Sequence, residues 1–218
     1  MKPYLVKTPK LVQWLFPRRV WAFSRKKPNI YLTFDDGPIP EVTLWVLELL
    51  KQYNAKATFF CIGDNIRKHP EIFQAIIAEG HSMGNHTFHH LKGTETTTHI
   101  YLEDIALVER EIHTLNLKIS NQQPTVHNLF RPPYGKMTSA QAKEVTQKGY
   151  KIVMWDVLSA DFDMKISAST CLENVLSNIK PGSIVVFHDS LKAEKNLRYV
   201  LPKVLEFVKS KEWNCVSI

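Results

Sequence analysis

The stretch Ile30-Tyr31-Leu32-Thr33-Phe34-Asp35-Asp36-Gly37-Pro38 sets the frame for the rest of the chain. Its apolar beginning, rich in branched and aromatic residues, is typical of a buried strand, and Gly37-Pro38 marks a turn after it. Two imidazoles, His86 and His90, follow four residues apart. One carboxylate with two imidazoles suits a hydrolytic metal such as zinc, and the other carboxylate is then free to act as a base. Taken alone, residues 35–38 would also make an ordinary turn, so residues elsewhere must decide between the two interpretations.

Beyond residue 29, apolar runs alternate with helical patterns. The expected strands are 30–34, 57–62, 81–83, 129–131, 150–155, 184–188 and 213–217. The expected helices are 41–53, 70–79, 101–115, 139–148, 167–179 and 195–209. Alternation of this kind predicts a parallel sheet, open or closed into a barrel, and about seven strands are fewer than a standard eight-fold barrel has.

Polar residues of the kinds that act in catalysis or metal binding lie at the ends of these predicted strands. In chain order they are Asp35 with Asp36, His86, Arg131, Asp156 with Asp161, and His188. The carboxyl ends of parallel strands meet at one edge of the sheet, where α/β proteins carry their sites. Five polar clusters at strand ends are hard to obtain from core packing alone, and they favour a functional site over a simple turn.

Composition bounds the class of protein. A chain of 218 residues that is 44% hydrophobic is expected to form one α/β domain with a substantial core. Its three cysteines, Cys61, Cys171 and Cys215, are far apart and form no metal-binding pair, so we expect buried small apolar side chains. The net charge of +7 is uneven, because residues 1–34 carry eight Lys or Arg and no acid, which leaves −1 elsewhere. A nucleic-acid binder would more often spread its cations over the fold.

Residues 1–29 form a basic, aromatic lead-in ahead of a predicted domain at 30–218. Thr8-Pro9 predicts the start of a short helix, which Pro17 ends. Two alternatives stay open for this segment. It contacts an anionic membrane surface weakly, or it packs on the domain with its charges in water. No apolar run is long enough to span a membrane and none resembles a signal peptide, so a cytoplasmic or membrane-surface location is expected.

Five motifs carry a family resemblance. In order they are Thr-Phe-Asp-Asp-Gly-Pro (33–38), Gly-Asn-His-Thr-Phe-His-His (84–90), Phe-Arg-Pro-Pro-Tyr-Gly (130–135), Trp-Asp-Val-Leu-Ser-Ala-Asp-Phe (155–162) and Val-Val-Phe-His (185–188). Together they resemble the NodB-homology polysaccharide deacetylases, carbohydrate esterase family 4. The resemblance implies a deformed (β/α) barrel of about seven parallel strands. It covers most of the chain but not residues 1–29.

The resemblance also implies a set of roles. Asp36, His86 and His90 would hold one divalent ion, zinc in the first place, with cobalt or nickel as alternatives. Asp35 would take a proton from the attacking water, and Arg131 would hold its carboxylate in place.

The remaining roles concern the departing group and the developing charge. His188 would protonate the departing amine, with Asp161 raising its pKa and fixing its tautomer. The backbone N–H of Tyr134, which follows Pro133, would stabilise the oxyanion.

Two departures from the family pattern affect the fourth motif. Leu158 and Phe162 stand where the family usually has a carboxylate and a tryptophan, and Val185 replaces a leucine conservatively. The first change leaves open whether Asp161 or Asp156 supports His188. The second alters the apolar wall beside that histidine, so the choice of substrate is expected to differ.

The sequence therefore predicts a metal-dependent hydrolase that removes N-acetyl groups from the amino sugars of a polysaccharide or its precursor. An acetylated glycan is the expected partner, nucleic acid is not, and the chain is expected to be a monomer. Two alternatives remain. One is an esterase or amidase of the same superfamily that acts on O-acetyl sugars or a small non-sugar amide. The other is a catalytically silent glycan-binding module.

Overall fold

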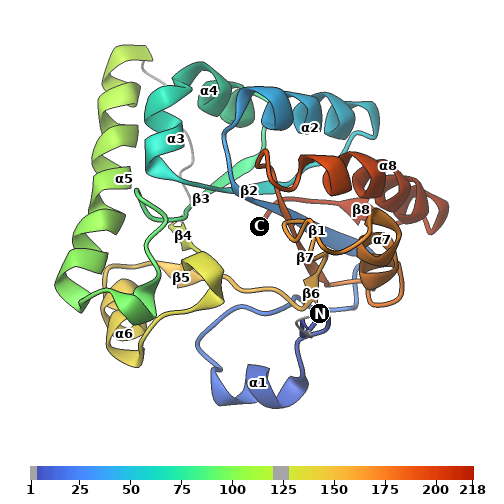
Figure 1. Ribbon diagram of the computed structural model, residues 1–218, viewed down its shortest axis with the longest axis horizontal. Coiled ribbons are helices and arrows are strands. Elements are labelled where there is room, and N and C mark those ends of the chain that lie inside the picture. Colours follow the sequence, from blue (N-terminus) through green and yellow to red (C-terminus); the bar gives the residue numbers. More distant parts are fainter. Residues whose placement is uncertain (1–3, 120–127) are drawn as a thin grey trace.

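A parallel sheet curls into a half-barrel in the computed structural model, which describes residues 4–119 and 128–218 (Figure 1). The strand order is β5–β4–β3–β2–β1–β7–β6, and β8 pairs with β1 beside this path. The strands are β1 (Asn29–Asp36), β2 (Thr58–Cys61), β3 (Ser82–Asn85), β4 (Leu129–Phe130), β5 (Lys151–Ile152), β6 (Val157–Leu158), β7 (Ile184–His188) and β8 (Asn214–Cys215). The predicted deformed barrel of about seven parallel strands is thereby confirmed.

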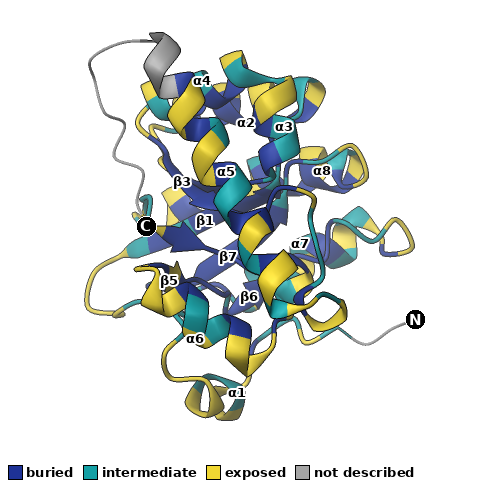
Figure 2. Ribbon diagram, turned by 90° about the vertical axis from the view of Figure 1, so that its left-hand side faces the viewer, coloured by how far each residue is buried: buried dark blue, intermediate teal, exposed yellow. Residues whose placement is uncertain are grey.

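Helices cover the outer face of the sheet (Figure 1). They are α2 (Pro40–Gln52), α3 (Gly63–Lys68), α4 (Pro70–Ala78), α5 (Thr98–Ile119), α6 (Ser139–Gln147), α7 (Ala168–Leu176) and α8 (Glu194–Ser210). A further helix, α1 (Lys10–Leu15), has no buried residue and lies at the lower end of the molecule in Figure 1. Figure 2 shows the strands buried between helices whose outer faces are exposed. No helix among the described residues is long and apolar enough to cross a membrane.

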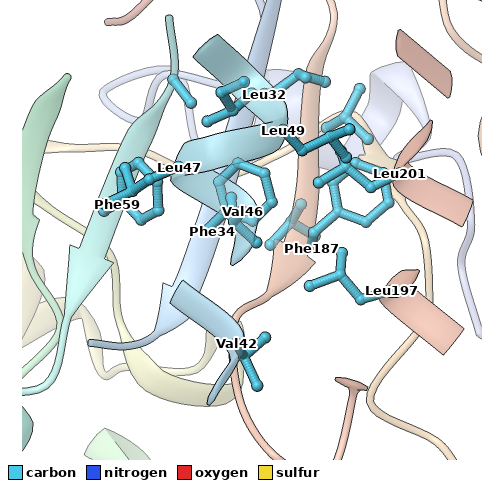
Figure 3. Packing of buried hydrophobic residues seen from close by; sticks show 14 of the residues in the cluster. Leu32, Phe34, Val42, Val46, Leu47, Leu49, Phe59, Phe187, Leu197 and Leu201 are labelled. Atoms are coloured by element: carbon cyan, nitrogen blue, oxygen red, sulfur yellow. The ribbon is translucent and has the colours of Figure 1, made fainter. Parts of the chain in front are cut away.

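The main core lies between β1 and the helices α2 and α8. Phe34 of β1 stacks on Phe59 of β2 at 5.1 Å between ring centroids and on Phe187 of β7 at 5.9 Å. Figure 3 shows Val46 of α2 and Leu201 of α8 closing over these rings. β1 lies inside the sheet with a parallel neighbour on each side, and its residues from Leu32 to Asp35 are all buried. The carboxylates at its end are therefore held on a rigid support.

The lead-in packs against both edges of the sheet. The Val20 N–H donates to the Ile152 carbonyl at 2.8 Å beside β5, and the Thr8 N–H donates to the Asp156 carbonyl at 3.0 Å beside β6. Trp21 is 9% exposed and belongs to a cluster under β5 and α6. Residues 4–23 thus span the side left open between the two edge strands, while residues 1–3 lie outside the described part. Two alternatives were left open for the lead-in, membrane contact and packing on the domain. Thr8, Val20 and Trp21 pack on the domain, whereas no residue of α1 is buried.

Candidate active site

The candidate site lies at the carboxyl ends of the strands. The sheet register places the proposed base, Asp35, beside the proposed acid, His188. Asp35 at the end of β1 is the register partner of His188 at the end of β7. Asp36 is the register partner of Cys61, at the end of β2. Ladder hydrogen bonds fix the spacing of neighbouring strands at roughly 4.8 Å, so the proposed base and the proposed acid face the same space.

Asp36, His86 and His90 come together as the sequence predicts. One ligand atom from each lies within 4.8 Å of the others. His86 Nδ1 lies 2.8 Å from the Arg131 carbonyl. Because a carbonyl can only accept, Nδ1 carries the proton and Nε2 keeps its lone pair, 3.8 Å from Asp36 Oδ1. His90 Nε2 lies 3.4 Å from the same oxygen.

The electrostatics of this group fit a cation. Burial, with the neighbouring His90, lowers the pKa of His86 to about 3, so the imidazole is neutral, as a metal ligand must be. Burial also lowers the pKa of His90. Asp36 Oδ1 is buried without a hydrogen-bond partner among the described residues. An orphaned buried carboxylate oxygen facing two neutral imidazoles is costly unless a cation occupies the space between them, so these residues suit a divalent ion.

The turn that carries the two imidazoles is fastened to α5. Thr87 and His90 adopt positive φ angles of 64° and 56°, a conformation that needs outside support in residues other than glycine. Asp104 of α5 supplies it, because its Oδ2 accepts from the N–H groups of Phe88 at 2.8 Å and His89 at 3.0 Å. Its Oδ1 lies 2.5 Å from His89 Nδ1, so His89 is turned away from the ligand group.

Arg131 is fully buried beneath Asp35. Its Nη1 donates to Asp35 Oδ1 at 2.6 Å and to Thr33 Oγ1 at 2.8 Å. Its Nε and Nη2 donate to the carbonyls of Val153 and Met154. The guanidinium carbon also lies 4.0 Å from the centroid of the Phe60 ring. The Asp35 carboxylate is thus held by a buried cation that three further hydrogen bonds keep in place.

His188 is partnered by Asp161, not by Asp156. His188 Nδ1 lies 2.8 Å from Asp161 Oδ1, and the His188 N–H donates to the other oxygen of the same carboxylate. Burial of His188 opposes protonation, but the Asp161 carboxylate outweighs it and raises the pKa of His188 to about 9. Asp156 instead accepts from Lys7 Nζ at 2.6 Å. The geometry thereby resolves the alternative that the sequence left open.

Tyr134 and Pro133 border the ligand group from the β4 side. Pro133 is buried and begins a short 3-10 turn, Pro133–Gly135, in which Tyr134 has a φ of 59°. The Tyr134 side chain is 60% exposed, and its ring lies 4.7 Å from that of His90. Phe162 borders the other side, with its ring 4.8 Å from that of His188. An exposed aromatic ring and a partly buried one therefore flank the space above the strand ends.

Three supporting residues escaped the sequence analysis. They are Asp104, Asn65, whose amide donates to the Asp36 carbonyl at 2.7 Å, and Asp189. Asp189 is fully buried and accepts from the Gly37 N–H at 2.9 Å and the Thr43 hydroxyl at 2.6 Å. Burial raises its pKa to about 8. Of the three, only Asp104 could have been noticed in the sequence, because it is a carboxylate on the apolar face of the helix that also carries Ile105 and Val108.

Comparisons with known proteins agree with this geometry. Residues 23–153 match the family model described as polysaccharide deacetylase. A peptidoglycan-N-acetylglucosamine deacetylase of Bacillus cereus is 38% identical over 172 residues, which cover 78% of this chain but 60% of that protein. A second Bacillus cereus protein of that name is 32% identical over 199 residues, 91% of this chain and 90% of the relative. A chitooligosaccharide deacetylase of Azorhizobium caulinodans is 32% identical, with 76% of each protein covered.

A solved structure extends the match to the whole fold. It is the Bc1960 peptidoglycan N-acetylglucosamine deacetylase bound to a naphthyl N-oxidanyl-benzamide. The TM-score is 0.85 at 32% identity, with 97% of this chain and 95% of that chain covered. The family model spans more than half of this chain, and the second Bacillus cereus relative matches over nearly all its length. On these grounds the chain belongs to the polysaccharide deacetylase family.

Proposed function

We propose that this chain is a metal-dependent hydrolase that removes N-acetyl groups from the amino sugars of a polysaccharide or its precursor and releases acetate. The observation that carries the proposal is the orphaned Asp36 Oδ1 facing His86 and His90, with a buried base and a partnered histidine beside it. Three relatives named as deacetylases of peptidoglycan N-acetylglucosamine or of chitooligosaccharides support an acetylated glycan as the substrate.

Asp36, His86 and His90 would hold one divalent ion, which we propose to be zinc, with cobalt or nickel able to replace it. Such an ion, when bound, acidifies water and polarises the acyl carbonyl. Asp35, held by Arg131, takes the proton from the attacking water. The N–H of Tyr134 donates to the carbonyl oxygen as it gains charge. His188 Nε2 gives a proton to the amine nitrogen as the C–N bond breaks, so a free amine and acetate leave.

Asp35→Asn tests this assignment directly. Because the amide cannot accept the proton, we expect turnover to fall by about 10²- to 10⁴-fold while the zinc content is unchanged. His86→Ala should lose the metal, and a full metal load in that variant would refute the ligand set. The measurement is acetate release from N-acetylglucosamine oligomers, peptidoglycan fragments and O-acetylated xylan, with added zinc and with chelator. Release from the xylan alone would replace the amide by an ester substrate, and release that chelator leaves untouched would end the metal proposal.

We further propose that residues 30–218 act as the catalytic domain, with residues 1–29 as its lead-in, and that the chain acts as a monomer. All nine candidate residues that the sequence identified lie within 30–218. Light scattering during size-exclusion chromatography measures the oligomeric state, and a dimer mass would refute the monomer.

A further inference from the structure

The exposed apolar side chains of the lead-in gather on α1 and its flanks. Five of the eleven large, exposed apolar side chains among the described residues lie within residues 5–16. Leu5 precedes α1 in the chain, and the four on α1 or at its end we call the α1 patch: Leu11, Trp14, Leu15 and Phe16. Trp14 is 74% exposed and Leu11 65%, and α1 has no buried residue. Large apolar side chains that cluster at the surface of an otherwise well-packed domain mark an interaction surface.

A basic hollow adjoins the α1 patch. A cavity of about 520 Å³ lies between the end of α1 and α6, with Leu15 and Phe16 among its apolar lining. Three cations line it, Arg18, Arg19 and Lys143, and no carboxylate is among the described residues around it. The Arg19 guanidinium lies over the Phe16 ring at 4.4 Å. These three side chains form no ion pair with any described residue.

The surroundings of the α1 patch are also positive. Lys10 lies on α1, and Arg25, Lys26 and Lys27 are exposed in the turn before β1. Slight burial is the largest cause that lowers the pKa of Lys180, and repulsion from the neighbouring Arg25 and Lys7 adds to it. Positive charge therefore accumulates in this region. Figure 1 places α1 at the lower end of the molecule, away from α2, α4 and α8, and Figure 2 shows it beyond α6.

Two features together select the occupant of this surface. A tryptophan and leucines flanked by arginine and lysine suit the boundary between headgroups and acyl chains, where rings and stems are apolar and the cations meet phosphates. A second copy of the chain placed symmetrically would bring the same cations against each other. We propose that the α1 patch and the basic hollow dock this protein on an anionic lipid surface, with Trp14 and Leu15 in the interfacial layer and Arg18, Arg19 and Lys143 on headgroup phosphates.

Vesicle sedimentation of the full chain tests the proposal. We expect binding to vesicles of phosphatidylcholine with phosphatidylglycerol, weaker binding in high salt, and little binding to phosphatidylcholine alone. Arg18→Gln with Lys143→Gln should weaken partitioning about 25-fold, since each cation near the surface contributes roughly fivefold. Trp14→Ser with Leu15→Ser should abolish binding in high salt, where the charges are screened.

Matched controls keep the outcome clear. Leu191→Ser removes a leucine that is 61% exposed on another face, and Lys209→Gln with Lys211→Gln removes two cations at the end of α8. Both should bind vesicles like the parent chain. Thermal unfolding of each variant checks that all are folded. Equal partitioning to neutral and anionic vesicles, equal losses in the controls, or no binding to any vesicle would overturn the proposal. A dimer that forms through Trp14 would replace the lipid by a second copy.

Discussion

Arg131 is fully buried, and its four side-chain hydrogen bonds tie Asp35 and Thr33 of β1 to the carbonyls of Val153 and Met154. A lysine at this position keeps the charge but cannot reproduce the forked, planar set of N–H donors of the guanidinium. We expect Arg131→Lys to lower the free energy of unfolding by about 3 kcal/mol, because it leaves buried oxygens without donors. Turnover should fall as well, because Asp35 loses its fixed orientation.

Urea denaturation and acetate release measure the two effects of Arg131→Lys. Arg67 is the matched control, since it pairs with Asp64 on α3 with its side chain 55% exposed. Arg67→Lys should change the unfolding free energy by no more than about 0.5 kcal/mol. Equal losses in the two variants would show that burial of Arg131 is not what matters.

His188 gives a prediction about pH. Its proposed role as an acid requires the imidazolium, whose fraction falls as pH rises through its pKa of about 9. Asp161→Asn removes the carboxylate that raises this pKa, so the pKa falls and the decline of activity moves to lower pH. The measurement is the pH dependence of kcat. Asp156→Asn, which removes a carboxylate bound to Lys7, should leave the position of the alkaline limb unchanged. If both variants keep the parent profile, His188 is not the acid.

At the scale of elements, α5 supports the turn 86–90 through Asp104. Partners of this kind fix the orientation of ligands without touching the ion. Asp104→Asn loses at least one of the bonds to the turn, so we expect the zinc affinity of the metal-free protein to fall about 10- to 100-fold. Competition with a chromogenic chelator measures it. Glu103→Gln, on the exposed side of the same helix, is the control and should bind zinc like the parent. Unchanged affinity in Asp104→Asn would show that the turn keeps its shape unaided.

Long periodic segments were predictable from the sequence, and short ones were not. The helices at Pro40–Gln52 and Glu194–Ser210 agree with the prediction within a residue or two, because each carries a continuous apolar stripe. The helix Gly63–Lys68 was missed, since its start, Gly-Asp-Asn, has the composition of a turn. The strand Val157–Leu158 was missed because two residues show no alternation, and it forms only by pairing with β7.

The residues of the candidate site also fall into those that the sequence predicted and those that it did not. The motifs predicted Asp35, Asp36, His86, His90, Arg131 and His188, because their residue types and spacing state their chemistry. The supporting contacts depend on elements far away in the chain. Asp104 reaches Phe88 across 16 residues, and Asp189 reaches Gly37 across 152 residues. Only the packing of α5 and the pairing of β1 with β7 bring these groups together. The sequence therefore does not show which groups they contact, although Asp104 stands out as a carboxylate on an apolar helix face.

At the scale of the whole molecule, the lead-in is part of the fold through Trp21. This side chain packs with Tyr101, Phe130 and Ile152, and its Nε1–H donates to the Phe16 carbonyl at 3.1 Å. We expect Trp21→Ala to lower the free energy of unfolding by about 3 to 5 kcal/mol, measured by urea denaturation. Trp14→Ala, in the same segment but exposed, should change it by less than about 0.5 kcal/mol. Similar values for the two tryptophans would mean that the lead-in detaches freely.

The register between β1 and β7 has a consequence for how this protein fails when heated. Asp35 and His188 face each other across two neighbouring interior strands. They cannot separate unless that ladder opens, and interior ladders open only with the cooperative unit that contains them. Heat inactivation and global melting should therefore be one transition, and the amide protons of these two strands should be among the last to exchange with solvent.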